Sequence, residues 1–480
     1  MDLASREKLG NKRFATPGWQ PHPWSAIAER PTGSNESSLY QKGQLIGSFS
    51  TTYFVCLPIL LARPYGSDFY SKTLRSFHDF LSSSAPTSFL SLRDLKFSGR
   101  TERADFDIMA DILKHATNLR SLTVGTRGVL RLREDVVEAI SSLSGLKSLL
   151  IRHEDPNATY FTLRRLEAPL THLHLEVDDY NTPPLPSLSN FQDTLEDLFL
   201  QRVTLTDVPF SFCKLTRLHL NFCPEPLLSV LVNAFPNLEV LVLKSVYKSV
   251  PDGLRDREEL RADNIEFQVH KQWHSLKSLT VDELGIRAMS LQTEVDSVVL
   301  PCMISFSDKL DHDWLYTLMR FLRPRHLQLT CDDTTRLQRA LSVGMERLDR
   351  LDLLVDNPGT LSPEKIMDGI YTACRFLQAR MIFCDINIIL DRERIDLAAF
   401  EPENIARTIM LAAPKVTHIK LIIELYDFQP SHTSYWAVNE DGDEKQLRGI
   451  SSSEEISCIN RMFLPAPIQK DNYELKFWPA

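Results

Sequence analysis

Histidine, carboxylate, aromatic and arginine side chains recur at alternate positions of three closely spaced segments of this 480-residue chain. They are His172, His174 and Glu176, then Asp197, Phe199 and Gln201, and finally Arg217, His219 and Asn221. Such side chains could hold a metal ion, or they could form the centre of a protein-binding surface. They could also be the mixed polar residues that any solvated sheet face carries. The elements that position them decide between these interpretations.

The three segments share one phrase, Leu-x-x-Leu-x-Leu. It reads LTHLHL from Leu170, LEDLFL from Leu195 and LTRLHL from Leu215. The same phrase, with variants, occurs as LRDLKF from Leu92, LRSLTV from Leu119, LKSLLI from Leu146, LEVLVL from Leu238, LKSLTV from Leu276, LDRLDL from Leu348 and VTHIKL from Val416. Most starts lie 20 to 28 residues apart, which is the period of a leucine-rich repeat. Each such unit buries its apolar side only by stacking on its neighbours.

Alternation within the phrase predicts which side chains are exposed. Side chains of a strand point alternately to its two faces, so the fourth and sixth positions join the first in the core, while the third, fifth and seventh face outward. Adjacent strands lie about 4.8 Å apart, so equal positions form stripes. The nine polar and aromatic residues are therefore predicted to share one partner-binding groove. We predict no metal site, because His219 would lie about 10 Å from His172 and His174.

Amphipathic stretches such as FDIMADILKHATN, PLLSVLVNAFPN and PEKIMDGIYTACRFLQAR separate the phrases. A helix that precedes each strand predicts an α/β leucine-rich-repeat solenoid, or horseshoe, with parallel strands on the concave face and helices on the convex face. The interval from Leu238 to Leu276 is longer than those before it. Its charged stretch DGLRDREELRADN is predicted to leave the array as a loop.

The same pattern divides the chain into four parts. Residues 1–44 are rich in Pro, Ser, Gly and Asn without an apolar period, which predicts a flexible tail. Residues 45–88 are predicted to form a short helical cap or the remnant of another helical module. The repeat array is expected at 89–428, and a C-terminal cap and tail at 429–480.

Composition restricts the classes of partner. With 54 Lys and Arg against 63 Asp and Glu, the net charge is −9, which argues against nucleic acid. The eight cysteines include no Cys-x-x-Cys pair, as expected for reduced thiols in the cytoplasm or nucleus. Cys223 and Cys331 each follow a strand phrase, where we predict packed core thiols. The longest early apolar run, Tyr53–Ala62, is half of the ~20 residues that a membrane span needs, so we predict no membrane partner.

One unit, LTRLHLNFCPEPLLSVLVNAFPNLEVLVL, resembles the cysteine-containing class of leucine-rich repeat, whose members often carry an F-box ahead of the array. Upstream, SFSTTYFVCLPILLARPY from Ser48 to Tyr65 resembles the end of an F-box with its linker. The order is similar to that of the F-box/leucine-rich-repeat proteins of fungi. The chain departs from that pattern because no Leu-Pro-x-Glu opening occurs between Met1 and Gln44, so the F-box is incomplete or degenerate.

The resemblance implies a substrate-recognition adaptor of a Skp–cullin ubiquitin ligase, which would bind a protein in its concave groove. The residues implied to face the Skp subunit are Tyr53, Phe54, Leu57, Pro58 and Leu60. Ligase chemistry in that family belongs to other subunits, so no catalytic residue and no cofactor are expected here. The alternative is a stand-alone repeat protein that binds a partner without any link to ubiquitin.

A third class, an enzyme, has little support in the sequence. The chain contains no Gly-x-Gly-x-x-Gly, no phosphate-binding Gly-Lys-Ser/Thr loop, no His-Glu-x-x-His and no Gly-x-Ser-x-Gly, which are motifs of common catalytic sites. A GTPase-activating role would need an arginine or asparagine at the end of a repeat. Arg127 and Arg202 follow strand phrases, but nothing in the sequence singles them out. We therefore predict a protein without enzymatic activity.

Overall fold

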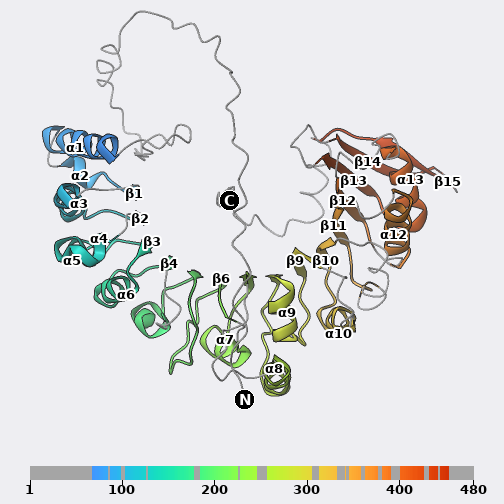
Figure 1. Ribbon diagram of the computed structural model, residues 1–480, viewed down its shortest axis with the longest axis horizontal. Helices are drawn as coiled ribbons and strands as arrows, with labels where there is room; N and C mark the ends of the chain where they lie inside the picture. Colours follow the sequence, from blue (N-terminus) through green and yellow to red (C-terminus); the bar gives the residue numbers. More distant parts are fainter. Residues whose placement is uncertain are drawn as a thin grey trace, which may run out of the picture. The chain divides into compact units, whose positions relative to one another are not determined.

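The protein is an α/β molecule in which helices and strands alternate along the chain, as the computed structural model shows (Figure 1). The structure describes residues 67–84, 87–98, 103–125, 128–177, 184–224, 227–245, 257–304, 313–331, 341, 345–357, 363–376, 381–390, 401–425, 432–441 and 444–452. Within these ranges fifteen strands form one open sheet. The predicted alternation of helix and strand holds for most of the described repeats, but the connection between Gln201 and Arg217 contains no helix.

Strands neighbour one another in the sheet in the order in which they occur in the sequence. They are β1 (Asp94–Ser98), β2 (Ser121–Gly125), β3 (Ser148–Glu154), β4 (His172–Val177), β5 (Asp197–Gln201), β6 (Arg217–Asn221), β7 (Val240–Lys244), β8 (Ser278–Val281), β9 (Ser297–Ile304), β10 (His326–Cys331), β11 (Arg350–Asn357), β12 (Phe383–Leu390), β13 (His418–Leu425), β14 (His432–Asp441) and β15 (Glu444–Gly449). The pairs from β1 to β13 are parallel, as for β4 with β5, whereas β14 and β15 add an antiparallel hairpin.

The helices lie on one side of this sheet (Figure 1). They are α1 (Ser67–Ser84), α2 (Thr87–Leu90), α3 (Arg103–His115), α4 (Val129–Leu132), α5 (Glu134–Ser141), α6 (Pro156–Arg165), the 3-10 helix η2 (Leu185–Phe191), α7 (Leu228–Ala234), α8 (Arg257–His270), α9 (Glu283–Met289), α10 (Asp313–Leu322), α12 (Pro363–Phe376) and α13 (Pro402–Ala412). Among these described helices, none is long and apolar enough to cross a bilayer.

Alternation along each strand places leucines between the sheet and the helices. In β4, β5 and β6 the second and fourth strand residues are all at most 2% exposed, while the residues between them are half-buried. The six buried residues are Leu173, Leu175, Leu198, Leu200, Leu218 and Leu220. The register pairs equal positions, so the leucines of β4, β5 and β6 lie beside one another. Burial of apolar surface thus fixes both the layer and the register.

The strands end in a recurring turn. Arg202, Phe222 and Ser245, each one residue past its strand, all have positive φ of 50° to 56°, the left-handed region that non-glycine residues seldom adopt. This conformation returns the next residue to the core, where Val203 and Cys223 are at most 3% exposed. Burial raises the pKa of the Cys223 thiol to about 11. The predicted core position of Cys223 is therefore confirmed, whereas the Cys331 side chain lies outside the described residues.

The predicted loop at DGLRDREELRADN is wrong where the structure describes it, because Arg257–His270 forms the helix α8. Leu260, Asn264 and Gln268 lie four residues apart and are at most 9% exposed, so they form one buried stripe. Two of these residues have amide side chains, so this stretch of the sequence resembles a polar, solvent-exposed loop. They are buried because they hydrogen-bond to backbone groups: Asn264 Oδ1 accepts from Leu228 N at 2.8 Å, and its Nδ2 donates to Ala288 O at 2.9 Å.

Strand β12 was not predicted, although the interval from Leu348 to Val416 has room for two repeats. Its phrase, MIFCDI from Met381, carries Met, Cys and Ile in place of the three leucines. These three side chains are nevertheless at most 1% exposed, and β12 pairs in register with β11 and β13. Met381, Cys384 and Ile386 are apolar and fill the same core positions, although the leucine phrase itself is absent from this strand.

The predicted helical cap, residues 45–88, is described only from Ser67 onward, without residues 85 and 86. Helix α1 contributes Leu74 and Leu81 to the core, and Phe89 of α2 joins them. His78 of α1 bonds through Nε2 to Asp111 Oδ2 of α3 at 2.7 Å, so this helix packs against the first repeat. The residues implied to face a Skp subunit, Tyr53, Phe54, Leu57, Pro58 and Leu60, lie outside the described residues.

We predict that Asn264→Ala lowers the free energy of unfolding by about 2–4 kcal/mol, because it leaves the buried Leu228 N–H and Ala288 C=O without partners. Chemical denaturation followed by circular dichroism measures the change. Glu266→Ala, at an exposed position of the same helix, is the matched control and should change stability little. An equal, small effect of both substitutions would contradict the structural role given to Asn264.

Candidate functional site

The register of β4, β5 and β6 brings the nine predicted partner-binding residues together in three rows. The rows are His172–Asp197–Arg217, His174–Phe199–His219 and Glu176–Gln201–Asn221. All nine are half-buried and alternate with the buried leucines. They lie on the face of the sheet opposite the helices, which we call the open face; it consists of the half-buried alternate residues of the strands. The structure brings these residues together on this face, and their binding role stays a prediction.

Aromatic rings form the centre of this part of the open face. The rings of His174 and Phe199 stack with centroids 3.8 Å apart and an interplanar angle of 17°. On the other side of Phe199, the His219 ring lies 6.2 Å away and is tilted by 38°. Both separations are in or near the range of favourable aromatic pairs. Phe199 is thereby held between two histidines, with little freedom left in its side chain.

A charged group of the neighbouring row, Glu176 of β4, bonds to this aromatic centre. Glu176 Oε1 accepts a hydrogen bond from His174 Nε2 at 2.8 Å, and Arg152 Nε of β3 lies 3.0 Å from the same oxygen. Burial raises the pKa of Glu176, but the hydrogen bond from His174 and the charges of Arg152 and His153 outweigh it, so the pKa lies below its ordinary value. The carboxylate is therefore ionised at neutral pH. Arg152 occupies the seventh position of its phrase, so the alternation rule could have added it to the predicted site.

The row His172–Asp197–Arg217 is held by a longer ion pair than the one at Glu176. Arg217 Nη1 lies 4.0 Å from Asp197 Oδ2, and the two side chains are 38% and 18% exposed. His172 is held from the side, because its Nδ1 lies 2.8 Å from Thr171 Oγ1. Arg217 is thus the more accessible member of an extended ion pair, and its guanidinium retains freedom to meet a partner group.

His219 is a second group of this site whose pKa is shifted by its surroundings. Burial lowers its pKa, and Lys244, His174 and Arg217 lower it further, while the Asp197 charge acts in the opposite direction. The net shift is downward, so His219 is neutral at pH 7. A neutral imidazole presents one donor and one acceptor, which suits hydrogen bonding to a polypeptide.

The metal interpretation gains no support from the geometry. Phe199 lies between His174 and His219 in the register, so the two imidazoles are not adjacent. Over the ranges that the structure describes, no group of three or more His, Cys, Asp or Glu side chains is arranged to hold a metal ion.

A second polar cluster on the open face was not predicted. On β10 and β11, Asp352 accepts from His326 Nε2 at 2.9 Å and from Arg350 Nε at 2.7 Å. On β12 and β13, Lys420 Nζ donates to Asp385 Oδ2 at 2.9 Å. The phrases that start at Leu348 and Val416 could have placed Asp352 and Lys420, but Asp385 lies on β12, where other residues replace the leucines.

The pKa values of the two carboxylates of this second cluster are shifted in opposite directions, although their strands are paired at these positions. Burial raises the pKa of Asp352, but the hydrogen bonds and charges of His326 and Arg350 bring it below its ordinary value. Burial also raises the pKa of Asp385, and the neighbouring Asp352 charge adds to this, so its pKa stays raised despite Lys420 and Arg350. These internal ion pairs leave little charge for an outside partner.

We predict that His219 titrates below the usual histidine range of about 6.5, and that Asp197→Asn lowers the midpoint further because it removes the carboxylate charge that favours the imidazolium. The Cε1–H resonance of His219, followed by NMR between pH 4 and 8, measures both midpoints. A midpoint at or above the usual range, or an upward shift in the variant, would contradict this electrostatic account.

Comparisons with known proteins add little to this geometry. The sequence matches no protein-family model and has no significant match among curated proteins. Among solved structures it is similar to a chain in the crystal structure of the Rad7 and Elc1 complex in yeast, with 14% identity over 76% of this chain and 90% of that chain and a TM-score of 0.35. A likeness this distant adds nothing to the architecture that the structure itself displays.

Proposed function

We propose that this chain is a leucine-rich-repeat protein that binds another protein on the open face of β3 to β6. One observation carries the proposal: the row His174–Phe199–His219 is half-buried and held by stacking, with an ion pair on either side. Aromatic residues and arginine dominate the energetic centres of protein interfaces. A set that is already held in place loses little side-chain entropy when it binds.

The position of this row within the sheet supports the same proposal. Its side chains project from paired strands rather than from loops, so the backbone beneath them is fixed by the parallel ladder. A partner would meet a central aromatic ring with Arg217 on one side and the Arg152–Glu176 pair on the other. Polar groups that surround a packed apolar centre are typical of interfaces between proteins.

We predict that Phe199→Ala and Arg217→Ala each weaken binding of the physiological partner by more than about 1 kcal/mol, as expected for central anchors. Affinity purification with the full chain would first identify proteins captured by the wild type and lost from both variants. Titration calorimetry with the purified candidate then measures the affinity of each variant.

The control for this experiment is Thr123→Ala, which changes a half-buried side chain on β2, two strands away from β4. Circular dichroism should show that all variants keep the fold, because none of the three residues belongs to the leucine core. Unchanged affinity in both anchor variants would move the binding surface elsewhere on the protein.

A finer proposal is that the protein delivers its bound partner to a Skp–cullin ubiquitin ligase. The support for it is the resemblance of Ser48–Tyr65 to the end of an F-box, directly ahead of the first described helix. The alternative is a stand-alone binding protein, in which the N-terminal residues only cap the array. Both readings share the open-face surface and differ only in the role of residues 45–88.

We predict that the full-length protein binds a purified Skp subunit, and that the double substitution of Leu57 and Leu60 by Asp abolishes this binding, because an F-box docks through apolar helices. Phe199→Ala serves as the control and should bind Skp like the wild type. If the wild type fails to bind Skp in size-exclusion chromatography, the adaptor role is excluded and the stand-alone role stands.

A further inference from the structure

The open face changes in composition at β7. Its half-buried alternate positions are Val240, Val242 and Lys244, so this strand adds two aliphatic side chains and a cation to the face. The neighbouring positions of β8 are Ser278 and Thr280, which are small and uncharged. On these two strands the open face therefore carries no carboxylate that could pair with the lysine.

Lys244 is a cation without an anionic partner. Among the residues that the structure describes, its Nζ takes part in no hydrogen bond and no ion pair, whereas Arg217 of β6 lies 4.0 Å from Asp197. The charge of Lys244 is one of those that lower the pKa of His219, so its field reaches the open face of β6. A half-buried charge is screened less than one in open water. An anion from a partner would therefore gain more at Lys244 than at a fully exposed lysine.

Two amide side chains continue the row of Lys244. The register aligns Gln201 of β5 and Asn221 of β6 with Lys244 of β7, a row about 10 Å long at the usual strand spacing. That distance is the length of about three residues of extended chain. Within the described part of the chain, neither side-chain amide makes a hydrogen bond. Each amide offers donors and an acceptor, which are the groups that the backbone of an extended segment needs.

We propose that the partner contacts β5 to β7 through an extended acidic segment. A carboxylate of this segment pairs with Lys244, its backbone bonds to the amides of Gln201 and Asn221, and an aliphatic side chain packs on Val240 and Val242. The pair with Lys244 is a charge-assisted hydrogen bond, which is stronger than a neutral one. Contact with the two valines removes apolar surface from water. The inference rests on the proposed protein-binding function and adds the chemistry of the partner.

A phage-displayed library of random dodecapeptides tests this chemistry with defined probes. The full-length wild type and the variant Lys244→Glu each serve as bait. We expect the wild type to enrich peptides in which Asp or Glu lies next to Val, Ile or Leu. The variant should enrich Lys or Arg at the acidic position, because the substitution reverses the charge that the peptide meets.

The affinity of one selected peptide then assigns the binding to Lys244. Fluorescence anisotropy with the labelled peptide should show binding at least tenfold weaker to Lys244→Glu, and also weaker to the milder variant Lys244→Gln. Replacement of the acidic residue of the peptide by lysine should restore binding to Lys244→Glu. Lys96→Glu is the matched control, because Lys96 is an exposed lysine of β1 and its substitution changes the net charge equally. Circular dichroism verifies the fold of each variant.

The inference is wrong if the wild type enriches no peptide, or only peptides without an acidic residue. It is also wrong if Lys244→Glu and Lys96→Glu weaken binding equally, because net charge alone would then explain the effect. The physiological partner separates this inference from the proposed function. A partner that Phe199→Ala loses, but that Lys244→Glu binds like the wild type, would overturn the acidic segment alone. A partner that Phe199→Ala, Arg217→Ala and Lys244→Glu all retain would overturn both.

Discussion

The burial of leucines between neighbouring repeats is the constraint on which the rest of the structure depends. Strand β5 alone would leave Leu198 and Leu200 exposed to water. In the protein the adjoining strands and the helical layer cover these two side chains. Because side chains alternate along a strand, a shift of one residue would expose these leucines and bury the polar row instead. The register that protects the core therefore also assembles Phe199 with its neighbours on the open face.

The sequence was most informative where the leucine phrase is intact. From β4 to β6 the phrase predicted the strands, the buried positions and the half-buried rows. It failed at β12, where Met381, Cys384 and Ile386 fill the same volume without the signature. It failed again at α8, because Asn264 and Gln268 are buried for their hydrogen bonds. The contacts themselves, such as the 3.8 Å stack of His174 on Phe199, depend on side-chain rotamers that no pattern specifies.

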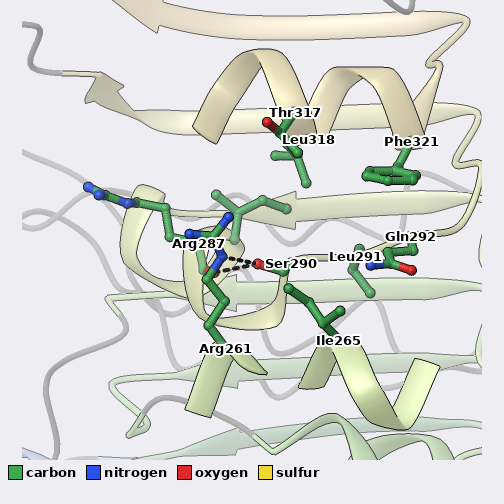
Figure 2. Close-up of a pocket in the computed structure, with 10 residues that line it drawn as sticks. Arg261, Ile265, Arg287, Ser290, Leu291, Gln292, Thr317, Leu318 and Phe321 are labelled. Carbon is green, nitrogen blue, oxygen red and sulfur yellow. Dashed lines mark hydrogen bonds between the residues drawn. The ribbon is translucent and has the colours of Figure 1, made fainter. Parts of the chain in front are cut away.

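The two sides of the sheet offer different chemistry. The open face presents polar and aromatic groups that largely neutralise one another, as in the pairs Arg152–Glu176 and Asp385–Lys420. Apart from Lys244, such a surface recognises shape and hydrogen bonds rather than net charge, in keeping with a protein partner. On the helical side, residues of α8, α9 and α10 line a hollow (Figure 2).

Site-specific photo-crosslinking tests the central claim most directly. Benzoylphenylalanine would replace Phe199 on the open face and, in separate proteins, Phe161 of α6 and Tyr371 of α12, which are 48% and 37% exposed on the helical side. The account predicts that the partner crosslinks from position 199 and from neither helical position. A partner that crosslinks from positions 161 or 371 but not from 199 would contradict it.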